Sequence, residues 1–197
     1  MSSTGRGYER HKTDYYVTPA NVVGAFIKRF EEKVLEFNPR WKYLDPCCGG
    51  DQNNPATYVE VLKDHLGPEG KITGIDIRTD SRSDVQGDFL TMDLKQNRPD
   101  VIISNPPFYL AEEFIVHSLN QVSEGGLVIM LLRLNFFGSQ KRRIFFENNM
   151  PKYCFIHHRR ISFTGGPTDS IEYAHFVFQK NDKGLQTQND SCKIYLI

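Results

Sequence analysis

The chain has 197 residues, of which 39% are hydrophobic and 24% are charged, a composition typical of a soluble domain with one full hydrophobic core. Its 24 basic and 24 acidic residues give a formal net charge of zero, so bulk charge indicates no particular partner. No apolar run approaches the roughly 20 residues of a membrane span, and the N-terminus lacks the apolar segment of a secretory signal. We therefore expect a cytoplasmic protein, in the host cytoplasm if a virus encodes it.

The four cysteines do not have the spacing of a metal site. Cys47 and Cys48 are adjacent, whereas the cysteines of zinc sites are usually separated by two or more residues. His157 and His158 are adjacent too, and neighbouring side chains on a strand face opposite ways. We expect no metal, and four reduced thiols that are buried or half-buried.

The domain begins with a helix behind a polar arm at residues 1–16. Thr18-Pro19 is typical of a helix start, with Thr18 as the cap and Pro19 in the first turn. Apolar residues recur at helical spacing from there to residue 37, and Asn38-Pro39 ends the pattern. We therefore predict an amphipathic helix over 19–37.

From residue 41 the pattern alternates between strands and helices as far as residue 180. We expect strands at 41–45, 71–77, 85–89, 101–105 and 127–132, β-rich stretches at 153–163 and 172–179, and helices at 55–66, 110–122 and 139–149. Such alternation predicts one α/β domain over 17–180, with a mostly parallel seven-stranded sheet and helices on both faces. The polar tail at 181–197 has room for a short strand at its end. Because Asp76 and Asp88 are too close in sequence for a helical crossover, we expect only a loop or single turn at Thr79–Asp84.

Polar residues follow four consecutive predicted strands. They are Asp45-Pro46-Cys47-Cys48-Gly49-Gly50, Gly74-Ile75-Asp76-Ile77, Gly87-Asp88-Phe89 and Asn105-Pro106-Pro107-Phe108. One acid after a strand is more often a turn former than a ligand. Ligands of open α/β sheets bind beyond the carboxyl ends of the strands, however, so four such segments in order indicate a binding site there.

These segments resemble the motifs of class I (Rossmann-like) S-adenosylmethionine-dependent amino-methyltransferases, most of all the phage and bacterial DNA adenine-N6 methyltransferases, over about residues 14–180. The resemblance implies S-adenosylmethionine as the cofactor, with the Asp-Pro-x-x-Gly segment wrapping its methionine end and Asp76 holding its ribose hydroxyls. It also implies that Asp88 and Phe89 meet the cofactor adenine, and that Thr18-Pro19 borders the methionine carboxylate. The cofactor-binding residues that follow from it are Thr18, Pro19, Asp45, Pro46, Gly49, Asp76, Ile77, Asp88 and Phe89.

Asn105-Pro106-Pro107-Phe108 is the most specific of these motifs, and the resemblance implies methyl transfer to an amino or amide nitrogen. The lone pair of such a nitrogen is delocalised, and two hydrogen-bond acceptors that bind both N–H bonds can draw the nitrogen toward tetrahedral geometry. The Asn105 side-chain oxygen and the Pro106 carbonyl can be those acceptors, and Pro107 restrains the backbone of Pro106. Phe108 offers a face on which a target base can stack, for about 1–3 kcal/mol.

Basic residues give candidate contacts to nucleic-acid phosphates. They are Lys141, Arg142, Arg143, Arg159 and Arg160, with Arg6, Arg10 and Lys12 in the arm. Phe163 matches the place where the resembling family often has an aromatic against a flipped base, and residues 163–170 resemble a loop over the active site. No insertion is large enough for a separate target-recognition region. Recognition is therefore loose, or a partner protein supplies it.

One residue departs from the pattern of the resembling family, and several alternatives stay open. Asp51 stands where a small residue is usual, so its carboxylate could pair with the cofactor ammonium or crowd its carboxylate. The same motif serves adenine in RNA, cytosine N4 and protein glutamine, and a catalytically silent nucleic-acid-binding or partner subunit is a further alternative. A nicotinamide-dependent oxidoreductase is disfavoured, because Gly49–Asn53 lacks the required G-x-G-x-x-G turn.

Overall fold

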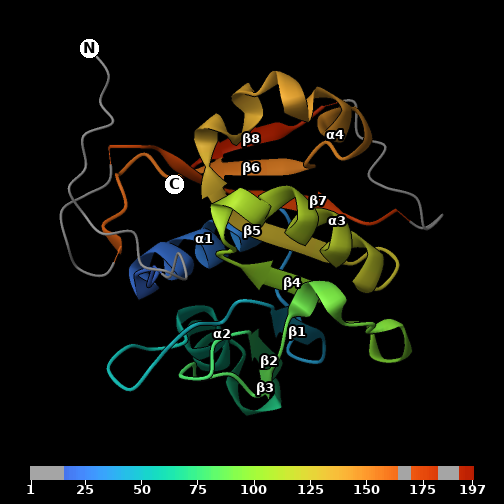
Figure 1. The fold of residues 1–197 in the computed structure, drawn as a ribbon. Helices are drawn as coiled ribbons and strands as arrows, with labels where there is room; N and C mark the ends of the chain where they lie inside the picture. The colour runs from blue at the N-terminus through green and yellow to red at the C-terminus, as the bar shows by residue number, and fades with distance from the viewer. Residues whose placement is uncertain (1–15, 164–169, 182–190) are drawn as a thin grey trace.

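The computed structural model describes residues 16–163, 170–181 and 191–197. These residues form one sheet of eight strands in the order β3-β2-β1-β4-β5-β7-β6-β8, which runs from bottom to top in Figure 1. The strands are β1 (Lys42–Asp45), β2 (Lys71–Asp76), β3 (Val85–Gln86), β4 (Val101–Ser104), β5 (Leu127–Arg133), β6 (Tyr153–Ile156), β7 (Tyr173–Gln179) and β8 (Lys193–Leu196). Only β7 is antiparallel to its neighbours, β5 and β6, so the predicted mostly parallel α/β sheet is confirmed.

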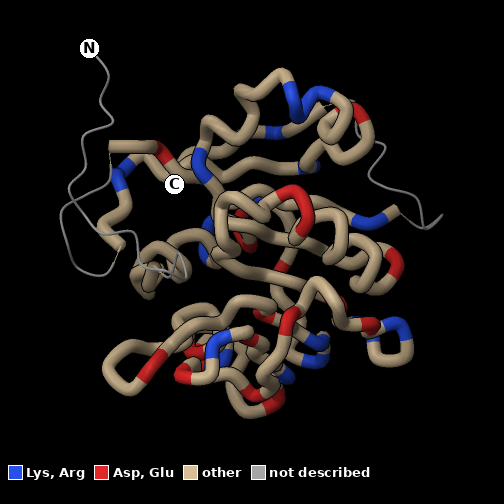
Figure 2. The backbone as a smooth tube through the Cα atoms, viewed as in Figure 1, with Lys and Arg blue, Asp and Glu red and all other residues tan. Residues whose placement is uncertain are grey.

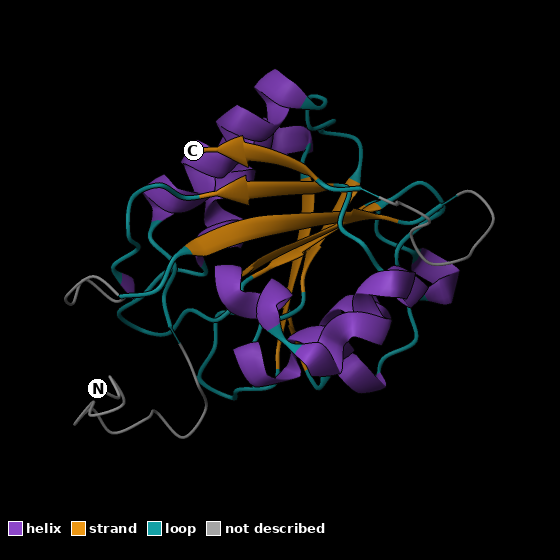
Figure 3. Ribbon diagram, turned by 90° about the horizontal axis from the view of Figure 1, so that it is seen from above, coloured by secondary structure: helices purple, strands orange, loops and turns teal. Residues whose placement is uncertain are grey.

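Helices cover both faces of the sheet, as Figure 3 shows. They are α1 (Ala20–Lys33), α2 (Thr57–Leu66), α3 (Ala111–Gln121) and α4 (Arg143–Asn148). In the central strand β4, Val101 and Ile103 pack with α1 and α2, whereas Ile102 packs with α3 on the opposite face. This alternation follows from the two-residue period of a strand, and it buries β4 on both sides.

The connection from β2 to β3 contains no helix, as predicted for Thr79–Asp84. Asp84 closes this short loop, because its backbone N–H donates to the Gly74 carbonyl at 2.9 Å while its carboxylate accepts from the Gly74 N–H at 2.7 Å. The loop therefore places no helix over the end of β2, where Asp76 lies.

The predicted count of seven strands is wrong, because β8 pairs in parallel with β6 as an eighth strand at the edge of the sheet. Two predicted strands are also too long. The one at 85–89 is reduced to Val85–Gln86, since Asp88 turns the chain into a short 3-10 segment. The stretch at 153–163 ends as a strand at Ile156, although Ile161 beyond it is buried.

The first helix ends at Lys33 and not at residue 37. Val34 leaves the helical conformation, with φ −126° and ψ −73°. Phe37 is buried against Phe30 and Tyr43, and its backbone N–H is bonded to the Glu31 carboxylate at 3.0 Å. The apolar spacing thus predicted the burial of Phe37 correctly, but its packing is achieved outside the helix.

The predicted helix at 139–149 is also shorter. Ser139 is extended, a 3-10 turn follows at Gln140–Arg142, and α4 spans only Arg143–Asn148. Several predictions fall on residues outside those described, namely the arm with Arg6, Arg10 and Lys12, and most of the loop at 163–170. Within the described ranges no helix is long and apolar enough to cross a membrane.

Candidate active site

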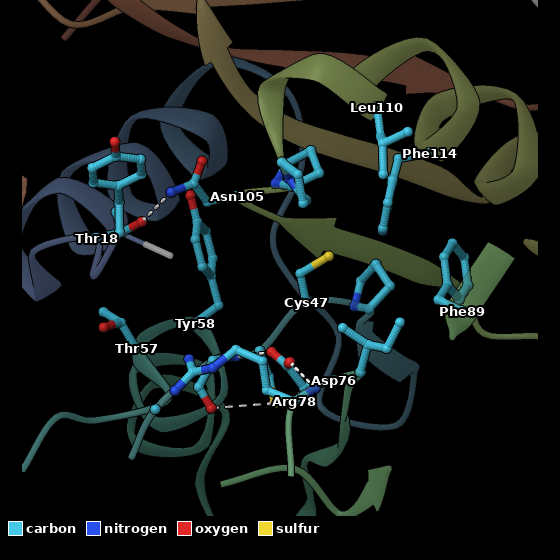
Figure 4. Close-up of a pocket in the computed structure, with 18 of the residues that line it drawn as sticks. Thr18, Cys47, Thr57, Tyr58, Asp76, Arg78, Phe89, Asn105, Leu110 and Phe114 are labelled. Atoms are coloured by element: carbon cyan, nitrogen blue, oxygen red, sulfur yellow. Dashed lines mark hydrogen bonds between the residues drawn. The ribbon is translucent and has the colours of Figure 1, made fainter. Parts of the chain in front are cut away.

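A cavity of about 310 Å³ opens at the carboxyl ends of β1, β2 and β4 (Figure 4). It brings together most of the residues that the sequence predicted for the cofactor and for catalysis. Those lining it are Thr18, Pro46, Gly49, Asp76, Ile77, Asp88, Phe89, Asn105, Pro106, Pro107 and Phe108. Pro19 and Asp45 do not line it, although both lie next to residues that do.

The turn after β1 depends on two glycines. Gly49 and Gly50 have φ values of 61° and 74°, a region that other residues rarely adopt. A side chain at Gly50 would also lie 2.9 Å from the backbone nitrogen of Ala56. The Gly49 N–H donates to the Asp76 carboxylate at 2.8 Å, which ties the turn to the end of β2.

Asp51 faces its own loop and does not line the cavity. One of its carboxylate oxygens accepts from the backbone N–H groups of Asn53 and Asn54, at 2.7 and 2.9 Å, and both oxygens accept from the Asn54 amide. The side-chain bond from Asn54 is the largest of the interactions that lower the Asp51 pKa. This carboxylate therefore stabilises the turn at 51–54, and nothing in its position crowds the cavity.

Asp45 is almost completely buried beneath the cavity. Its Oδ1 accepts from the Ser104 hydroxyl at 2.6 Å and from the Cys47 N–H at 3.1 Å. Burial raises the Asp45 pKa to about 7, although both hydrogen bonds act in the other direction. Since Ser104 directly precedes Asn105, Asp45 connects the end of β1 to the predicted catalytic segment and supports it from below.

Replacing Asp45 with Asn should change how stability depends on pH. The folded-state pKa of about 7 lies above the ordinary value of 3.8, so between about pH 4 and 7 the folded state holds a proton that the unfolded state has released. This group's contribution to stability therefore falls as pH rises through that window. Between pH 5 and 8 the wild type should lose about 2–3 kcal/mol relative to Asp45→Asn, measured by urea denaturation. Identical pH dependence of the two proteins would contradict the buried, proton-binding carboxylate.

Asp76 and Asp88 occupy neighbouring positions along the wall. Asp76 is 6% exposed, and its second oxygen accepts from the Arg78 N–H at 2.8 Å. Asp88 accepts from the Leu90 N–H at 3.0 Å and starts the 3-10 segment Phe89–Thr91. The Phe89 ring is buried against Phe114 on α3 and forms an apolar part of the wall.

Asn105 is held in one orientation by Thr18. Its amide nitrogen donates to the Thr18 hydroxyl at 3.1 Å, and Figure 4 shows the side chains facing each other across the cavity wall. Thr18 is therefore not the helix cap that the sequence suggested, since α1 starts at Ala20 behind Pro19 without a side-chain cap. The Asn105 oxygen is buried and has no hydrogen-bond partner among the described residues.

A row of aromatic rings leads away from the predicted catalytic segment. Phe108 packs against Tyr173 with ring centroids 5.7 Å apart, Tyr173 against Phe163 at 5.0 Å, and Phe163 against Tyr16 at 6.2 Å. The Arg133 guanidinium lies 4.9 Å from the centre of the Phe108 ring. Phe163, predicted from the resemblance, is thus connected to Phe108 through one intervening ring.

The basic residues predicted to contact phosphate lie in two separate places (Figure 2). Lys141, Arg142 and Arg143 lie just before α4 and at its start, and Arg159 lies in the turn after β6. Arg142 is engaged internally, with Glu112 at 2.8 Å and the Phe136 ring at 4.4 Å. Arg143 pairs with Glu147 at 3.6 Å and its side chain is 77% exposed. Lys141 is exposed in the same segment. Arg159 is exposed too, and it lines a second cleft of about 690 Å³ between the start of α1 and the turn after β6.

Several residues of the cavity were not predicted from the sequence. Thr57 and Tyr58 enter from the first turn of α2, and the Thr57 hydroxyl is buried without a hydrogen-bond partner among the described residues. Only the position of α2 directly behind the glycine turn could have indicated them. In the part of the chain that the structure describes, no group of His, Cys, Asp or Glu is arranged to hold a metal ion, and the four cysteines are free, buried or half-buried.

No family model matches the sequence, and no curated protein matches it. Solved structures do resemble the fold. A protein of Listeria monocytogenes assigned as a class I S-adenosylmethionine-dependent methyltransferase matches with a TM-score of 0.66 and 17% identity, over 92% of this chain and 65% of that one. The M protein of the type I restriction enzyme EcoKI matches with a TM-score of 0.62 and 15% identity, over 92% of this chain and 48% of its own.

A third similar structure, assigned as an RNA methyltransferase of Pyrococcus horikoshii, has a TM-score of 0.59 and 15% identity, over 91% of this chain and 94% of that one. At these identities the similarity shows the fold. The described residues thus have the Rossmann-like class I methyltransferase fold, as the sequence predicted. The chain spans about two-thirds of the Listeria protein and about half of the EcoKI M protein.

Proposed function

We propose that this protein is an S-adenosylmethionine-dependent N-methyltransferase whose acceptor is the N6 amino group of adenine in DNA. One observation carries the proposal. The Asn105 side chain lines the cavity and is fixed by Thr18, and its oxygen is buried without a partner among the described residues. A buried polar atom without a hydrogen bond costs stability, so its presence at this position indicates that a ligand completes it.

The cavity fits S-adenosylmethionine in the chemistry of its wall. Asp76 offers carboxylate oxygens for the ribose hydroxyls, and Asp88 and Phe89 offer an acceptor and an apolar wall for the adenine. The glycine turn lets the backbone approach the ligand closely, and the Thr57 hydroxyl at the start of α2, which has no partner among the described residues, suits the carboxylate of the methionine end. The bound cofactor would supply an activated methyl group.

The protein's own residues would orient the acceptor nitrogen. The Asn105 oxygen and the Pro106 carbonyl are hydrogen-bond acceptors for its two N–H bonds, and Phe108 offers a ring for stacking. No strong base is needed before the methyl transfer, because positioning of the nitrogen supplies most of the rate. The orientation of Asp51 toward its own loop supports an active enzyme over a catalytically silent protein.

Similar structures and surface features favour nucleic acid over protein as the acceptor. The structures include the M protein of a restriction enzyme and a protein assigned as an RNA methyltransferase. In this chain the rings of Phe108 and Tyr16, which both line the cavity, suit unstacked bases, and exposed Arg159 suits phosphate. The described residues contain no added recognition domain, so we expect target recognition to be loose or to come from a partner protein.

Methyl transfer from tritiated S-adenosylmethionine to DNA, RNA and a glutamine-containing protein mixture in parallel tests this proposal. When the labelled DNA is hydrolysed to nucleosides, the label should be in N6-methyldeoxyadenosine. Single-stranded or mismatched DNA should be methylated at least as well as duplex, because it saves a few kcal/mol of unstacking. Label found only in RNA, in cytosine or in protein would mean that this molecule, and not DNA adenine, is the methyl acceptor. Absence of S-adenosylmethionine binding in calorimetry would refute the proposed enzymatic activity.

Replacing Arg159 with Gln should weaken DNA binding in a salt-dependent way. If this side chain contacts one phosphate, the slope of log affinity against log salt should become shallower by about 0.9 for duplex or 0.7 for single strands. All sequences should be affected alike, because phosphate contacts carry no base information. Arg40→Gln is the matched control, since Arg40 is exposed just before the amino end of β1, whereas Arg159 follows the carboxyl end of β6. Equal slopes in both variants would exclude Arg159 from the interface.

A further inference from the structure

Three buried side chains from different elements form a continuous hydrogen-bonded chain. The Tyr58 hydroxyl on α2 lies 2.9 Å from Nε2 of His175 on β7, and Nδ1 of His175 lies 2.9 Å from Nε2 of His157. The three residues are 3%, 0% and 7% exposed, respectively. His175 is further fixed by Phe26, whose ring stacks on the imidazole with centroids 4.1 Å apart.

All three members are neutral at ordinary pH. Burial lowers the pKa of His157 to about 4 and that of His175 well below its usual value, and burial raises the pKa of Tyr58 well above its usual value. A neutral imidazole has one N–H donor and one acceptor nitrogen. The chain can therefore exist in two proton arrangements of opposite direction, with no charged member in either.

The two ends of the chain reach different cavities. Tyr58 lines the active-site cavity, and Figure 4 shows its ring rising from α2 toward Asn105 with the hydroxyl at the Asn105 end. His157 lines the second cleft, together with Arg159. The chain thus connects the place where the acceptor nitrogen would lie with a separate opening to solvent.

Methylation of an amino nitrogen releases one proton, and the residues beside Asn105 provide no lasting acceptor for it. The Asn105 amide and the Pro106 carbonyl accept hydrogen bonds but do not keep a proton. The carboxylates that line the cavity, Asp76 and Asp88, follow β2 and β3 and already accept from backbone N–H groups. A closed cavity with a bound acceptor therefore needs another route for the proton.

We propose that the Tyr58–His175–His157 chain carries this proton from the active site to the second cleft, an inference that rests on the proposed N-methyltransferase function. An N–H bond breaks on the methylated nitrogen and an O–H bond forms on Tyr58, whose own proton passes to Nε2 of His175. The proton on Nδ1 of His175 passes to Nε2 of His157, and the proton on Nδ1 of His157 leaves to water. When the product departs and water reaches Tyr58, the same transfers in reverse restore the starting arrangement.

Tyr58→Phe tests the relay, because it removes the phenolic oxygen and keeps the ring. We expect steady-state methyl transfer at least about 10-fold slower than in the wild type, with cofactor affinity within about twofold, since a positioned proton acceptor contributes at least this much. Added imidazole, at constant pH and ionic strength, should partly restore the variant because a small base can accept the proton directly. It should not accelerate the wild type.

His157→Gln interrupts the chain at its outer end without touching the active-site cavity, and it should show the same slow, imidazole-dependent turnover. His158→Gln is the matched control, because His158 is the exposed neighbour outside the chain, and it should behave like the wild type. Thermal melts identify any variant that does not fold. If either Tyr58→Phe or His157→Gln does not fold, the turnover of the remaining variant tests the relay. Normal turnover, or slow turnover that imidazole does not change, would refute the relay. A wild type that methylates no acceptor would instead refute the proposed function.

Discussion

Asn105→Ala should reduce methyl transfer by about 100-fold or more while S-adenosylmethionine still binds. The expected loss is that of one positioned hydrogen-bonding group that acts on the reacting centre. The Asn105 amide is oriented by the Thr18 hydroxyl at 3.1 Å, so its oxygen is directed by the fold before any acceptor arrives. Single-turnover transfer of labelled methyl to DNA, with cofactor affinity measured by calorimetry, separates the catalytic effect from a binding effect.

Two further variants give this experiment its controls. Thr18→Val keeps the shape of residue 18 but removes the acceptor for the Asn105 amide, so it should reduce the rate by a smaller factor of about 10, through loss of orientation. Asn148→Ala removes an exposed asparagine at the end of α4 and should leave the rate unchanged. Normal turnover of Asn105→Ala would mean that Asn105-Pro106-Pro107-Phe108 is only a turn after β4.

The sequence predicted the parts of this molecule that depend on neighbouring residues. Buried parallel strands are short apolar runs, and the turns after them need glycine, proline and polar side chains, so β4 and the segment at Asn105 could be located closely. The cavity then follows, because the carboxyl ends of parallel strands meet at one edge. The exact ends of the helices could not be predicted in this way, since apolar spacing indicates burial and not conformation, as Phe37 illustrates.

Features formed by distant residues had no signature in the sequence. Tyr58 and His175 are 117 positions apart, and nothing near either of them indicates that they would meet. Asp45 was predicted to bind the cofactor, but the structure places it below the cavity, bonded to Ser104 from another strand. Its elevated pKa depends on complete burial, which arises only when β1 and β4 pair in the sheet.

Asp76→Ala should weaken S-adenosylmethionine binding by about 1.5–3 kcal/mol, or roughly 10- to 150-fold in Kd. This is the free energy typical of hydrogen bonds to a charged group. The Asp76 carboxylate has two roles in this interpretation. It lines the cavity wall, where we propose that it accepts from the ribose hydroxyls, and it also accepts from the Gly49 N–H at 2.8 Å. Its removal would therefore loosen the glycine turn as well as delete a ligand contact, which places the expected loss toward the upper end of the range.

Asp76→Asn separates these two roles. The amide oxygen can still accept from the Gly49 N–H, so the turn should be retained, but the amide nitrogen can no longer accept from the Arg78 N–H, and the negative charge is lost from the proposed ribose site. We therefore expect a smaller loss than for alanine, measured by calorimetry with the cofactor alone. Asp93→Ala is the matched control, because its side chain is 64% exposed and pairs with Lys95 outside the cavity, so Kd should not change. If Asp76→Ala binds the cofactor as tightly as this control, Asp76 is not part of the site, and the cavity at the end of β2 must hold its ligand through its other residues.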